Sequence, residues 1–463
     1  MAVHPALDAF DLDVPVLIVG AGACGLVAAL AANEAGAAPL VIEADPVPAG
    51  STALSAGLIP AAGTALQRAA GIDDDPTIFA ADIQAKAKGE NPQVLVDTLA
   101  SAAAPAVDWL TDRHGLPFSI VDGFDYPGHS RRRMHGLPSR SGRELVDRLR
   151  ATCEAEGIDI ACDRRASTLF STGDRIAGVE VEGGENLGCR ALVLACNGFG
   201  GNREMVRAHM PEIGDALWFG HDGNRGDAVR WGEALGARLS HLGAYQGHGN
   251  VAHPHGILIT WATITEGGVQ VNAGGQRFWD ESQGYSEAAR AVLAEPGGTV
   301  WTLFDARIAA IARQFEDFRA AEAAGAIHEA ETVPELADRC GLPPAELAAT
   351  LRSIPQSGRD TFGRQFRGPP LAPPYRAVKV TGALFHTQGG LDVDRSARVR
   401  LATGGTIPNL FAAGGAAVGV SGKSDEGYLS GNGLLSAVAL GRIGGTEAAR
   451  EALRDGRSHR SGA

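Results

Sequence analysis

Residues 16–45, VLIVGAGACGLVAALAANEAGAAPLVIEAD, decide the fold. Two short apolar runs at the ends of this stretch predict buried strands, and the small residues between them predict a helix. Gly20, Gly22 and Gly25 form G-x-G-x-x-G at the first turn, where they allow a tight bend, close approach of a pyrophosphate and close packing of the helix. Glu43 ends the second strand, where an acid accepts hydrogen bonds from a ribose diol. The stretch therefore predicts a dinucleotide site.

Composition limits the classes of protein to which this chain can belong. The chain has 463 residues, of which 44% are hydrophobic and 21% charged, which predicts two or three folded domains with a large core. The net charge of −13 argues against a nucleic-acid partner. The six cysteines form no C-x-x-C pair, so we expect no metal site. With no leader-like start and no transmembrane segment in the sequence, we expect a cytoplasmic protein.

Segments spread along the chain carry a family resemblance. They are AGSTALSAGLIPAAGT (49–64), ALVLACNGFGGN (191–202), GNRGDAVRWGEALGA (223–237), GALFHTQGGLDVD (382–394), TIPNLFAAGGAAVG (406–419) and GYLSGNGLLSAVALGRIGG (427–445). In order and spacing they resemble the fumarate reductase/succinate dehydrogenase flavoprotein family, which implies FAD. Members with covalent flavin carry a histidine before the threonine of the first segment. This chain has Ser51 there, so the resemblance implies non-covalent FAD.

The expected fold follows from these segments and from local patterns. It is an α/β fold, with a Rossmann-like FAD-binding domain built on a parallel sheet with a β-meander, and with an inserted α+β capping domain. We expect residues 1–246 and 373–463 to form the FAD-binding domain and residues 247–372 to form the capping or substrate domain. Apolar spacing predicts helices over 93–114 and 142–157, and the chain should end in a polar tail, RDGRSHRSGA.

The glycine motif and the resemblance together assign a set of residues to the cofactor. They are Gly20, Ala21, Gly22, Gly25, Glu43, Ala44, Ser51, Thr52, Ser55, Gly57, Asn197, Gly198, Asp227, Gly414, Gly415, Asn432, Gly433 and Leu434. The last two open a predicted helix whose positive end would face the N1/O2 edge of the flavin.

Two tyrosines mark the substrate side. Fumarate reductases of the family use an arginine four residues after the glutamate of G-x-R-F-x-x-E, and a second one in N-R-L-G-G-N-x-L-L. This chain keeps the first motif up to Glu281 but has Tyr285 four residues later, and Tyr428 occupies the second arginine position. E-S-Q-G-Y and Y-L-S-G-N-G resemble another branch, the 3-ketosteroid Δ1-dehydrogenases and related cyclic-ketone desaturases. Leu429 and Asn432 depart from that branch, which has proline and glycine there.

The resemblance implies a role for each tyrosine. The Tyr428 hydroxyl, with a backbone N–H at the following helix, would polarise a ketone. Tyr285 would remove the neighbouring proton, which requires help from a donor or a helix dipole because the reference pKa of tyrosine is about 10. A hydride would then pass to flavin N5. Tyr126 is a counterpart of a third tyrosine of that branch. For each of the three, the alternative is a packing residue with a satisfied hydroxyl.

Other polar residues leave their roles open. His386, in H-T-Q-G-G, matches a substrate-binding histidine of the fumarate reductases, or is a structural histidine near the flavin. Arg131, Arg132 and Arg133 form either a solvated loop or a contact for an anionic substrate. His253, Thr265 and Glu266 copy another fumarate-reductase group, but the VN–GG–RF segment that follows them aligns only if about five residues are missing.

The function expected is FAD-dependent α,β-dehydrogenation of a ketone. The candidate substrates are a cyclic ketone such as 4-oxocyclohexanecarboxylate or cyclohexanone, and a 3-ketosteroid. The electrons would then leave to an external acceptor, which could be a quinone, a dye or oxygen. Two alternatives stay open: a fumarate-reductase-like reductase of an unsaturated acid, and a non-catalytic flavin-binding electron-transfer module.

Overall fold

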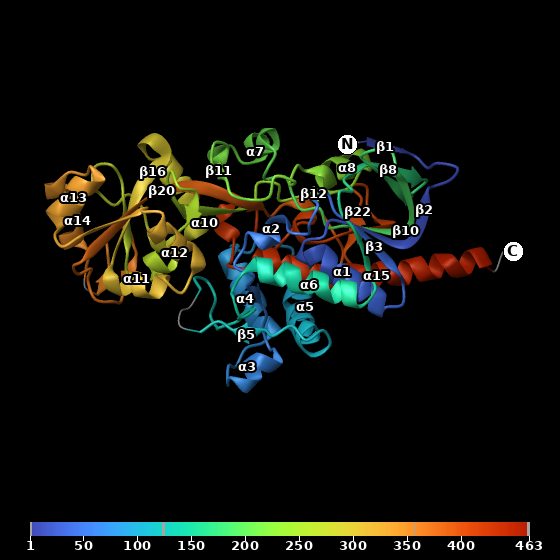
Figure 1. Cartoon of the computed structure of the whole chain (residues 1–463), viewed down its shortest axis with the longest axis horizontal. Helices are drawn as coiled ribbons and strands as arrows, with labels where there is room; N and C mark the ends of the chain where they lie inside the picture. The colour runs from blue at the N-terminus through green and yellow to red at the C-terminus, as the bar shows by residue number, and fades with distance from the viewer. Residues whose placement is uncertain (1, 123–125, 356, 461–463) are drawn as a thin grey trace. The chain divides into compact units, whose positions relative to one another are not determined.

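The structure, a computed structural model, describes residues 2–122, 126–355 and 357–460, and the side chains as far as 455 (Figure 1). Its chain divides into two compact units. The first unit comprises Met1–Met210, Gly220–Tyr245 and His386–Ala463, and the second comprises Pro211–Phe219 and Gln246–Phe385. We expected the inserted part to cover 247–372. The second unit runs further because strand β20 (Tyr375–Thr387) pairs with other strands of that unit over most of its length.

The sheet of the first unit is built on parallel strands. Strand β2 (Leu12–Val19) lies between β10 (Asn186–Leu194) and β3 (Pro39–Ile42), and all three run in the same direction. Beyond them, β7 (Asp159–Ala161) continues the parallel order on one side and β23 (Thr406–Ala412) on the other. This sheet confirms the Rossmann-like prediction.

The predicted meander is also present. Strands β8 (Ala166–Thr172) and β9 (Arg175–Val181) pair antiparallel, and β9 pairs antiparallel with β10. Strand β1 (Ala2–Pro5) adds to the outer edge of β8, and β22 (Arg398–Arg400) to the edge of β23.

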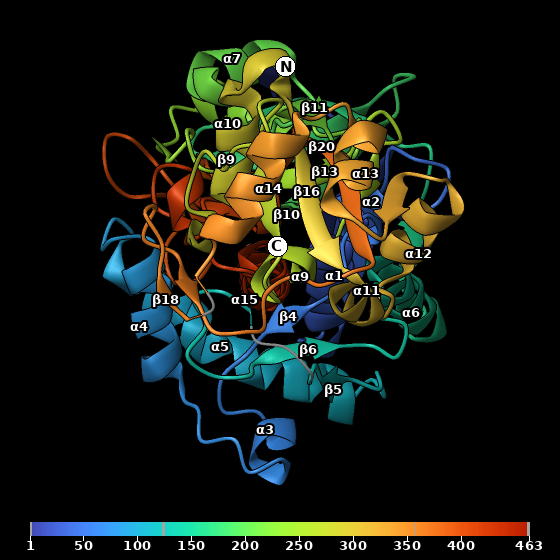
Figure 2. The ribbon, with the colours of Figure 1, turned by 90° about the vertical axis from the view of Figure 1, so that its left-hand side faces the viewer.

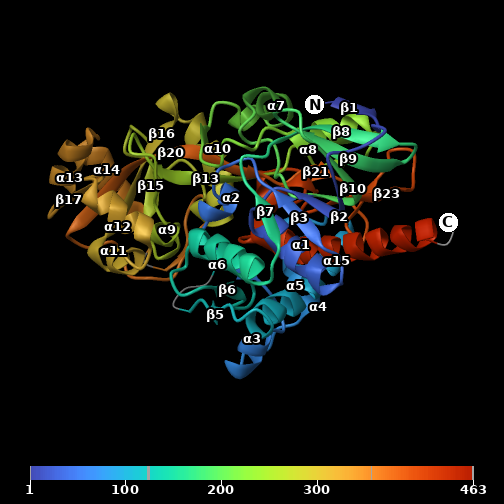
Figure 3. The ribbon, with the colours of Figure 1, turned by 45° about the vertical axis from the view of Figure 1, so that its right-hand side comes forward.

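Two helices lie side by side under the parallel strands (Figures 1 and 3). Helix α1 (Ala23–Glu34) buries ten of its twelve residues, and α15 (Asn432–Arg460) packs along it. Glycines of α15 make this contact possible: a Cβ at Gly441 would lie 2.8 Å from the Cys24 carbonyl, and one at Gly445 2.1 Å from the Ala28 carbonyl. This small-residue contact holds the middle of α15 directly against α1.

The C-terminal tail differs from its prediction. Residues 454–460 continue α15 as helix instead of forming a separate tail. Arg175 explains part of this, because its guanidinium pairs with Glu451 at 3.0 Å and with Asp455 at 3.5 Å, and these ion pairs tie the late turns of the helix to the sheet.

The remaining helices of the first unit flank this core. The two helices predicted from apolar spacing are α5 (Gln93–Asp112) and α6 (Gly142–Ala155). Helices α2 (Gly50–Ala53), α3 (Ala65–Ala69), α4 (Pro76–Lys86), α7 (Arg203–His209) and α8 (Asp227–Ala234) complete the set. A small sheet orders β4 (Ile59–Pro60), β6 (Met134–Gly136) and β5 (Ser119–Ile120), and β12 (Leu239–Ser240) pairs with β21 (Gly390–Leu391).

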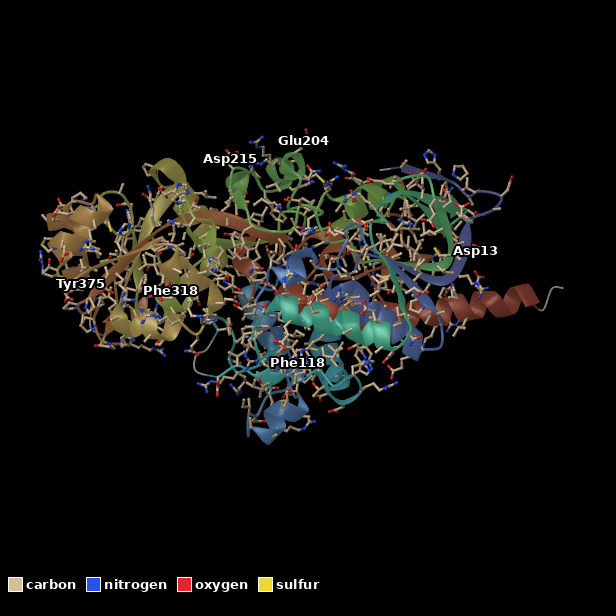
Figure 4. All side chains as sticks on the ribbon, viewed as in Figure 1. Asp13, Phe118, Glu204, Asp215, Phe318 and Tyr375 are labelled. Atoms are coloured by element: carbon tan, nitrogen blue, oxygen red, sulfur yellow. The ribbon has the colours of Figure 1, made fainter. Side chains whose placement is uncertain are left out.

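The second unit is a mostly antiparallel sheet with helices, in agreement with the α+β prediction, and only β11 (Leu217–Trp218) is known to pair parallel among its described strands (Figure 2). Its strand order is β14 (Ile257–Leu258), β13 (Tyr245–Ala252), β20, β16 (Thr299–Asp305) and β15 (Val269–Val271), with β11 and β17 (Ile327–Ala330) also paired to β20. Its helices are α9 (Ala262–Thr265), α10 (Tyr285–Ala294), α11 (Ala306–Ala312), α12 (Glu316–Ala323), α13 (Val333–Cys340) and α14 (Pro344–Ser353). Phe318, labelled in Figure 4, is fully buried and packs edge to face on Phe304.

Candidate active site

The glycine turn between β2 and α1 has the geometry that its sequence predicts. Gly20 has a φ of 105°, and a Cβ there would lie 2.6 Å from the Ala195 carbonyl oxygen. A Cβ at Gly25 would lie 1.8 Å from the Gly20 carbonyl, so the helix can start only with glycine at this position. Around Gly22, by contrast, only the Thr52 hydroxyl comes within 4 Å of a built Cβ. The backbone is therefore open where the positive end of α1 would receive a pyrophosphate.

Glu43 is held in place beside this turn. Its carboxylate is buried and accepts hydrogen bonds from the Ala21 N–H at 2.6 Å and the Asp45 N–H at 3.1 Å. Each carboxylate oxygen still has a lone pair for a further donor. These two hydrogen bonds thus fix the orientation of the Glu43 carboxylate, next to Ala44, for the predicted ribose contact.

The small-residue loop after β3 is held by His221 and Asn224, two residues to which the sequence assigned no role. The Ser51 hydroxyl accepts a hydrogen bond from the Asn224 amide at 2.8 Å, and His221 Nε2 lies 2.7 Å from the Asp45 carboxylate. We call these two pairs the clasp. The neighbouring Thr52 hydroxyl accepts from the Ala23 N–H at 3.2 Å, so the loop is also fixed to the start of α1.

Two predicted cofactor residues of this loop have local packing partners. The Ser55 hydroxyl donates to the Thr52 carbonyl and accepts from the Gly57 N–H. Gly57 has a φ of 65°, and a Cβ there would lie 2.7 Å from the Ser141 carbonyl. These contacts pack the loop against the start of α6.

The strand end at 195–198 packs against the glycines after β23. Asn197 adopts a φ of 65°, and its side-chain oxygen accepts from the Gly198 N–H at 2.8 Å. A Cβ at Gly415 would lie 2.0 Å from that oxygen, and one at Gly414, whose φ is 59°, would lie 3.1 Å from the Cys24 Cβ. Asp227 begins α8, and there its carboxylate accepts a hydrogen bond from Arg165 at 2.6 Å. Burial raises the pKa of this carboxyl, while Arg165 lowers it.

The start of α15 presents a buried acceptor. The Asn432 side-chain nitrogen donates to the Val420 carbonyl and the Ser421 hydroxyl, both at 3.1 Å. Its side-chain oxygen is buried and accepts no hydrogen bond from any described residue. Gly433 and Leu434 follow in the first turn. A cofactor that brings an N–H or O–H donor fits this position, and every residue predicted for the cofactor lies in the first unit.

Tyr428 and His386 are brought together in the first unit. Their rings meet edge to face, with centroids 5.8 Å apart at 84°. Burial lowers the pKa of His386 to about 4, so the ring is neutral at pH 7. Its Nδ1 lies 3.0 Å from the Thr387 carbonyl, which can only accept, so Nδ1 carries the proton. The Gln388 amide nitrogen lies within 3.2 Å of both ring nitrogens.

The arginine run beside Tyr126 is largely structural. Arg133 is buried and pairs with Asp74 at 2.9 Å and with Asp82. Arg131 is exposed and donates to the Asp73 carbonyl. His129, whose N–H donates to the Tyr126 carbonyl at 3.2 Å, also contacts the Ser430 carbonyl through Nε2 at 2.9 Å.

The His129 contact links the Tyr126 segment to the segment that carries Tyr428. Both segments belong to the first unit. Arg133 therefore belongs to an internal ion pair with Asp74. The role of Tyr126 in catalysis stays a prediction.

Tyr285 begins α10 in the second unit. It follows Gly284, whose φ of 136° suits glycine, and it lies at the positive end of a ten-residue helix. A helix N-terminus stabilises negative charge, which is the help that a tyrosine base needs.

The preceding turn is anchored by a buried ion cluster. Glu281 is fully buried and pairs with Arg277 and with Arg364, the latter at 3.2 Å. Arg277 also pairs with Asp360. The charges of both arginines are therefore matched by carboxylates within the cluster.

Aromatic rings surround Tyr285. His248 stacks on Tyr285 with centroids 4.9 Å apart and on Phe385 at 5.3 Å, while Phe385 stacks on Phe219 at 4.7 Å. We call these four residues the ring stack. Trp261 meets His248 edge to face at 5.8 Å. Burial lowers the pKa of His248 to about 3, so its imidazole is uncharged at neutral pH.

Sequence reasoning missed His248, because a single histidine in a strand has no distinguishing pattern. The alternative group of His253, Thr265 and Glu266 is not supported, since His253 and Thr265 are exposed. Among the described residues no cluster of three His, Cys, Asp or Glu side chains suits a metal ion. None of the described helices combines the length and apolarity that a bilayer crossing requires.

Comparison with known proteins gives the family. A family model described as an FAD-binding domain matches residues 15–434. A probable fumarate reductase of Shewanella frigidimarina is 33% identical, over 95% of this chain and 75% of its own length. The 4-oxocyclohexanecarboxylate 2-dehydrogenase of Sinomonas cyclohexanicum is 25% identical, over 87% of each chain.

A solved structure shows the same architecture. The 3-ketosteroid-Δ4-(5α)-dehydrogenase of Rhodococcus jostii RHA1 superimposes with a TM-score of 0.75 at 25% identity, over 97% of this chain and 100% of its own. The open glycine turn, the fixed Glu43 and the unpartnered Asn432 oxygen agree with the matched family model. The chain belongs to the FAD-binding domain family and is an FAD-dependent oxidoreductase related to the fumarate reductase flavoproteins.

Proposed function

We propose that this flavoprotein catalyses the α,β-dehydrogenation of a ketone. The observation that carries the proposal is that each of the two tyrosines at the arginine positions lies beside an uncharged histidine. Tyr428 meets the neutral His386 edge to face, and Tyr285 stacks on the neutral His248. Hydrogen-bond donors without charge suit a neutral carbonyl, whereas a dicarboxylate requires cations.

Each tyrosine has a distinct part in the proposed reaction. The Tyr428 hydroxyl donates a hydrogen bond to the ketone oxygen, where negative charge develops as the neighbouring C–H bond weakens. Tyr285 accepts the proton of that carbon, and the positive end of α10 stabilises the tyrosinate that must be present for this step. Bound FAD supplies the acceptor for the hydride that leaves the next carbon.

The same features support a class of substrate. A cyclic ketone such as cyclohexanone or 4-oxocyclohexanecarboxylate, or a 3-ketosteroid, offers the carbonyl and the adjacent CH–CH group. The names of two relatives, a 4-oxocyclohexanecarboxylate dehydrogenase and a ketosteroid dehydrogenase, support this class. An external acceptor such as a quinone, a dye or oxygen would complete the cycle.

A second candidate is a fumarate-type reduction of an unsaturated acid. The 33% identity to a probable fumarate reductase favours it. The ion pairs disfavour it, because Arg277 and Arg364 are already bound to Glu281 and Arg133 to Asp74.

An anaerobic titration separates the candidates. We expect a cyclic ketone to bleach the oxidised flavin absorbance and to yield the enone. Reduced enzyme that is reoxidised by fumarate, with no bleaching by any ketone, would establish the second candidate instead. An inert flavin in both assays would leave only the electron-transfer module.

A further inference from the structure

A tight turn joins Tyr428 to helix α15. The Asn432 N–H donates to the Leu429 carbonyl at 3.0 Å, and Gly431 has a φ of 85°, as the third residue of a type II turn requires. The carbonyl of Ser430 belongs to the central peptide of this turn. Types I and II differ by a flip of that peptide, so a contact that holds this carbonyl selects one form of the turn.

His129 makes such a contact. Its Nε2 lies 2.9 Å from the Ser430 carbonyl oxygen. The residue before it packs on the same turn, because a Cβ at Gly128 would lie 2.7 Å from Leu429 Cδ1. The His129 segment is therefore pressed against the turn, and the histidine fixes the direction of its central peptide.

The tautomer of His129 is fixed from both sides of the ring. The Ser430 carbonyl can only accept, so Nε2 carries the proton. Nδ1 lies 3.3 Å from Arg133 Nη1, which can only donate, so Nδ1 holds the lone pair. Burial and the charge of Arg133 lower the pKa of His129 to about 4. The ring at neutral pH is thus an uncharged donor aimed at the turn.

Arg133 is itself held rigidly. Its Nε and Nη2 donate to the two carboxylate oxygens of Asp74, both at 2.9 Å, and Nη1 pairs with Asp82. The guanidinium is 1% exposed and lies 4.7 Å from the centre of the buried Phe79 ring. Two charge-assisted partners give the arginine a single orientation. The buried ion pair therefore supports His129, and through it the turn.

We propose that His129 is a positioning residue for Tyr428, which acts by holding the Ser430 carbonyl and so the backbone next to the tyrosine. The inference rests on the proposed function, in which the Tyr428 hydroxyl donates to the ketone oxygen. A displacement of about 1 Å in a group of this kind can cost about 100-fold in rate. Ser430 is only two residues from Tyr428, so a loosened turn displaces the hydroxyl through the backbone.

Fluorine NMR tests the proposal without turnover. The chain has five tyrosines, so FAD-loaded enzyme labelled with 3-fluorotyrosine has five label positions, and the Tyr428 resonance is the one lost in Tyr428→Phe. His129→Phe keeps a ring but removes the donor, and we expect the Tyr428 resonance to shift or to broaden. His129→Gln offers an amide N–H to the Ser430 carbonyl and should return the resonance toward its wild-type position. Tyr375, in the second unit, is the internal reference.

Kinetics connect this position to the reaction. His129→Phe should lower kcat for cyclohexanone about 10-fold, the value of one lost hydrogen bond, and should change KM far less. In a Tyr428→Phe background the same substitution should have no further effect, because the group that it positions is absent. His114→Phe, which removes a buried histidine paired with Glu156 in the same unit, should leave kcat and the Tyr428 resonance unchanged.

Several results would overturn the proposal. An unchanged Tyr428 resonance in His129→Phe would mean that the turn holds without this hydrogen bond. Equal shifts at Tyr428 and Tyr375 that His129→Gln does not reverse would indicate a general loosening of the fold. Additive losses of kcat in the double variant would mean that His129 acts independently of Tyr428. If His129→Phe does not fold, His129→Met removes the donor in its place. An enzyme that oxidises no ketone would refute the proposed function, while the fluorine spectra would still decide whether His129 holds Tyr428.

Discussion

Phe385 and His386 are consecutive residues of β20, and their rings belong to two different aromatic groups, each of which contains a tyrosine. Phe385 stacks on His248, which stacks on Tyr285, whereas His386 meets Tyr428 edge to face. The division of the chain into its two units falls between these two residues.

Tyr428→Phe should lower kcat by about 100- to 1000-fold, because it removes the donor to the developing oxyanion. KM should change far less, since the ring still packs on His386. Dye-coupled steady-state kinetics with cyclohexanone measure both. Tyr375→Phe, at the start of β20, is the matched control. A wild-type rate in Tyr428→Phe would disprove the assignment of the carbonyl donor.

Tyr285→Phe should abolish proton removal while leaving ketone binding in place. We expect a fall in kcat of about 100-fold or more, the usual contribution of a positioned base. Mass spectrometry in D₂O can follow deuterium entering the α-carbon of the ketone, and the variant should show no enzyme-dependent exchange. Exchange at the wild-type rate would assign the base elsewhere.

The clasp should retain non-covalent FAD. Acid precipitation should release all the flavin, because Ser51 provides no imidazole for a covalent bond. Asn224→Ala removes the Ser51 contact and should raise the Kd for FAD about 5-fold, as measured by flavin fluorescence. Asn33→Ala removes a hydrogen bond of the same kind to Glu156 and should leave the FAD affinity unchanged. Flavin that stays with the precipitate would contradict the Ser51 interpretation.

The Glu281 cluster should stabilise the second unit. Glu281→Gln leaves the buried Arg277 and Arg364 without their shared carboxylate, at a cost of about 3–5 kcal/mol in the free energy of unfolding. Urea denaturation measures this change. Arg339→Ala breaks an exposed pair with Glu335 and should cost less than about 1 kcal/mol. Equal costs for the two variants would show that burial of the cluster contributes little.

Stability should fall as the solution is acidified below pH 6.5. Burial lowers the pKa of His135 to about 4 in the folded state, below the unfolded value of about 6.5. The unfolded state therefore binds more protons between these values, and unfolding is favoured as the pH falls from 6.5 to 4. His135→Gln should reduce the difference in unfolding free energy between pH 7 and pH 5, whereas His4→Gln, at an exposed site, should not. An unchanged difference in His135→Gln would show that this histidine is not a source of acid sensitivity.

The sequence predicts the first unit better than the second for a physical reason. The turn at Gly20 and the two strands around it are coded by neighbouring residues, so their pattern is visible in the chain. The ring stack assembles residues from distant segments, and although a local motif marks Tyr285, none marks Phe219, His248 or Phe385. The same limit applies to Arg133, whose burial depends on Asp74 and Asp82 far away in the sequence.

The continuity of β20 restricts how this enzyme can be recombined with its relatives. A chimera that exchanges the second unit at its natural limit takes Phe385 from one parent and His386 from the other. Such a junction falls inside β20, two residues before the end of the strand. A crossover placed after Thr387, at the end of the strand, transfers both supports together. Library design for altered ketone range should therefore place its breakpoint there.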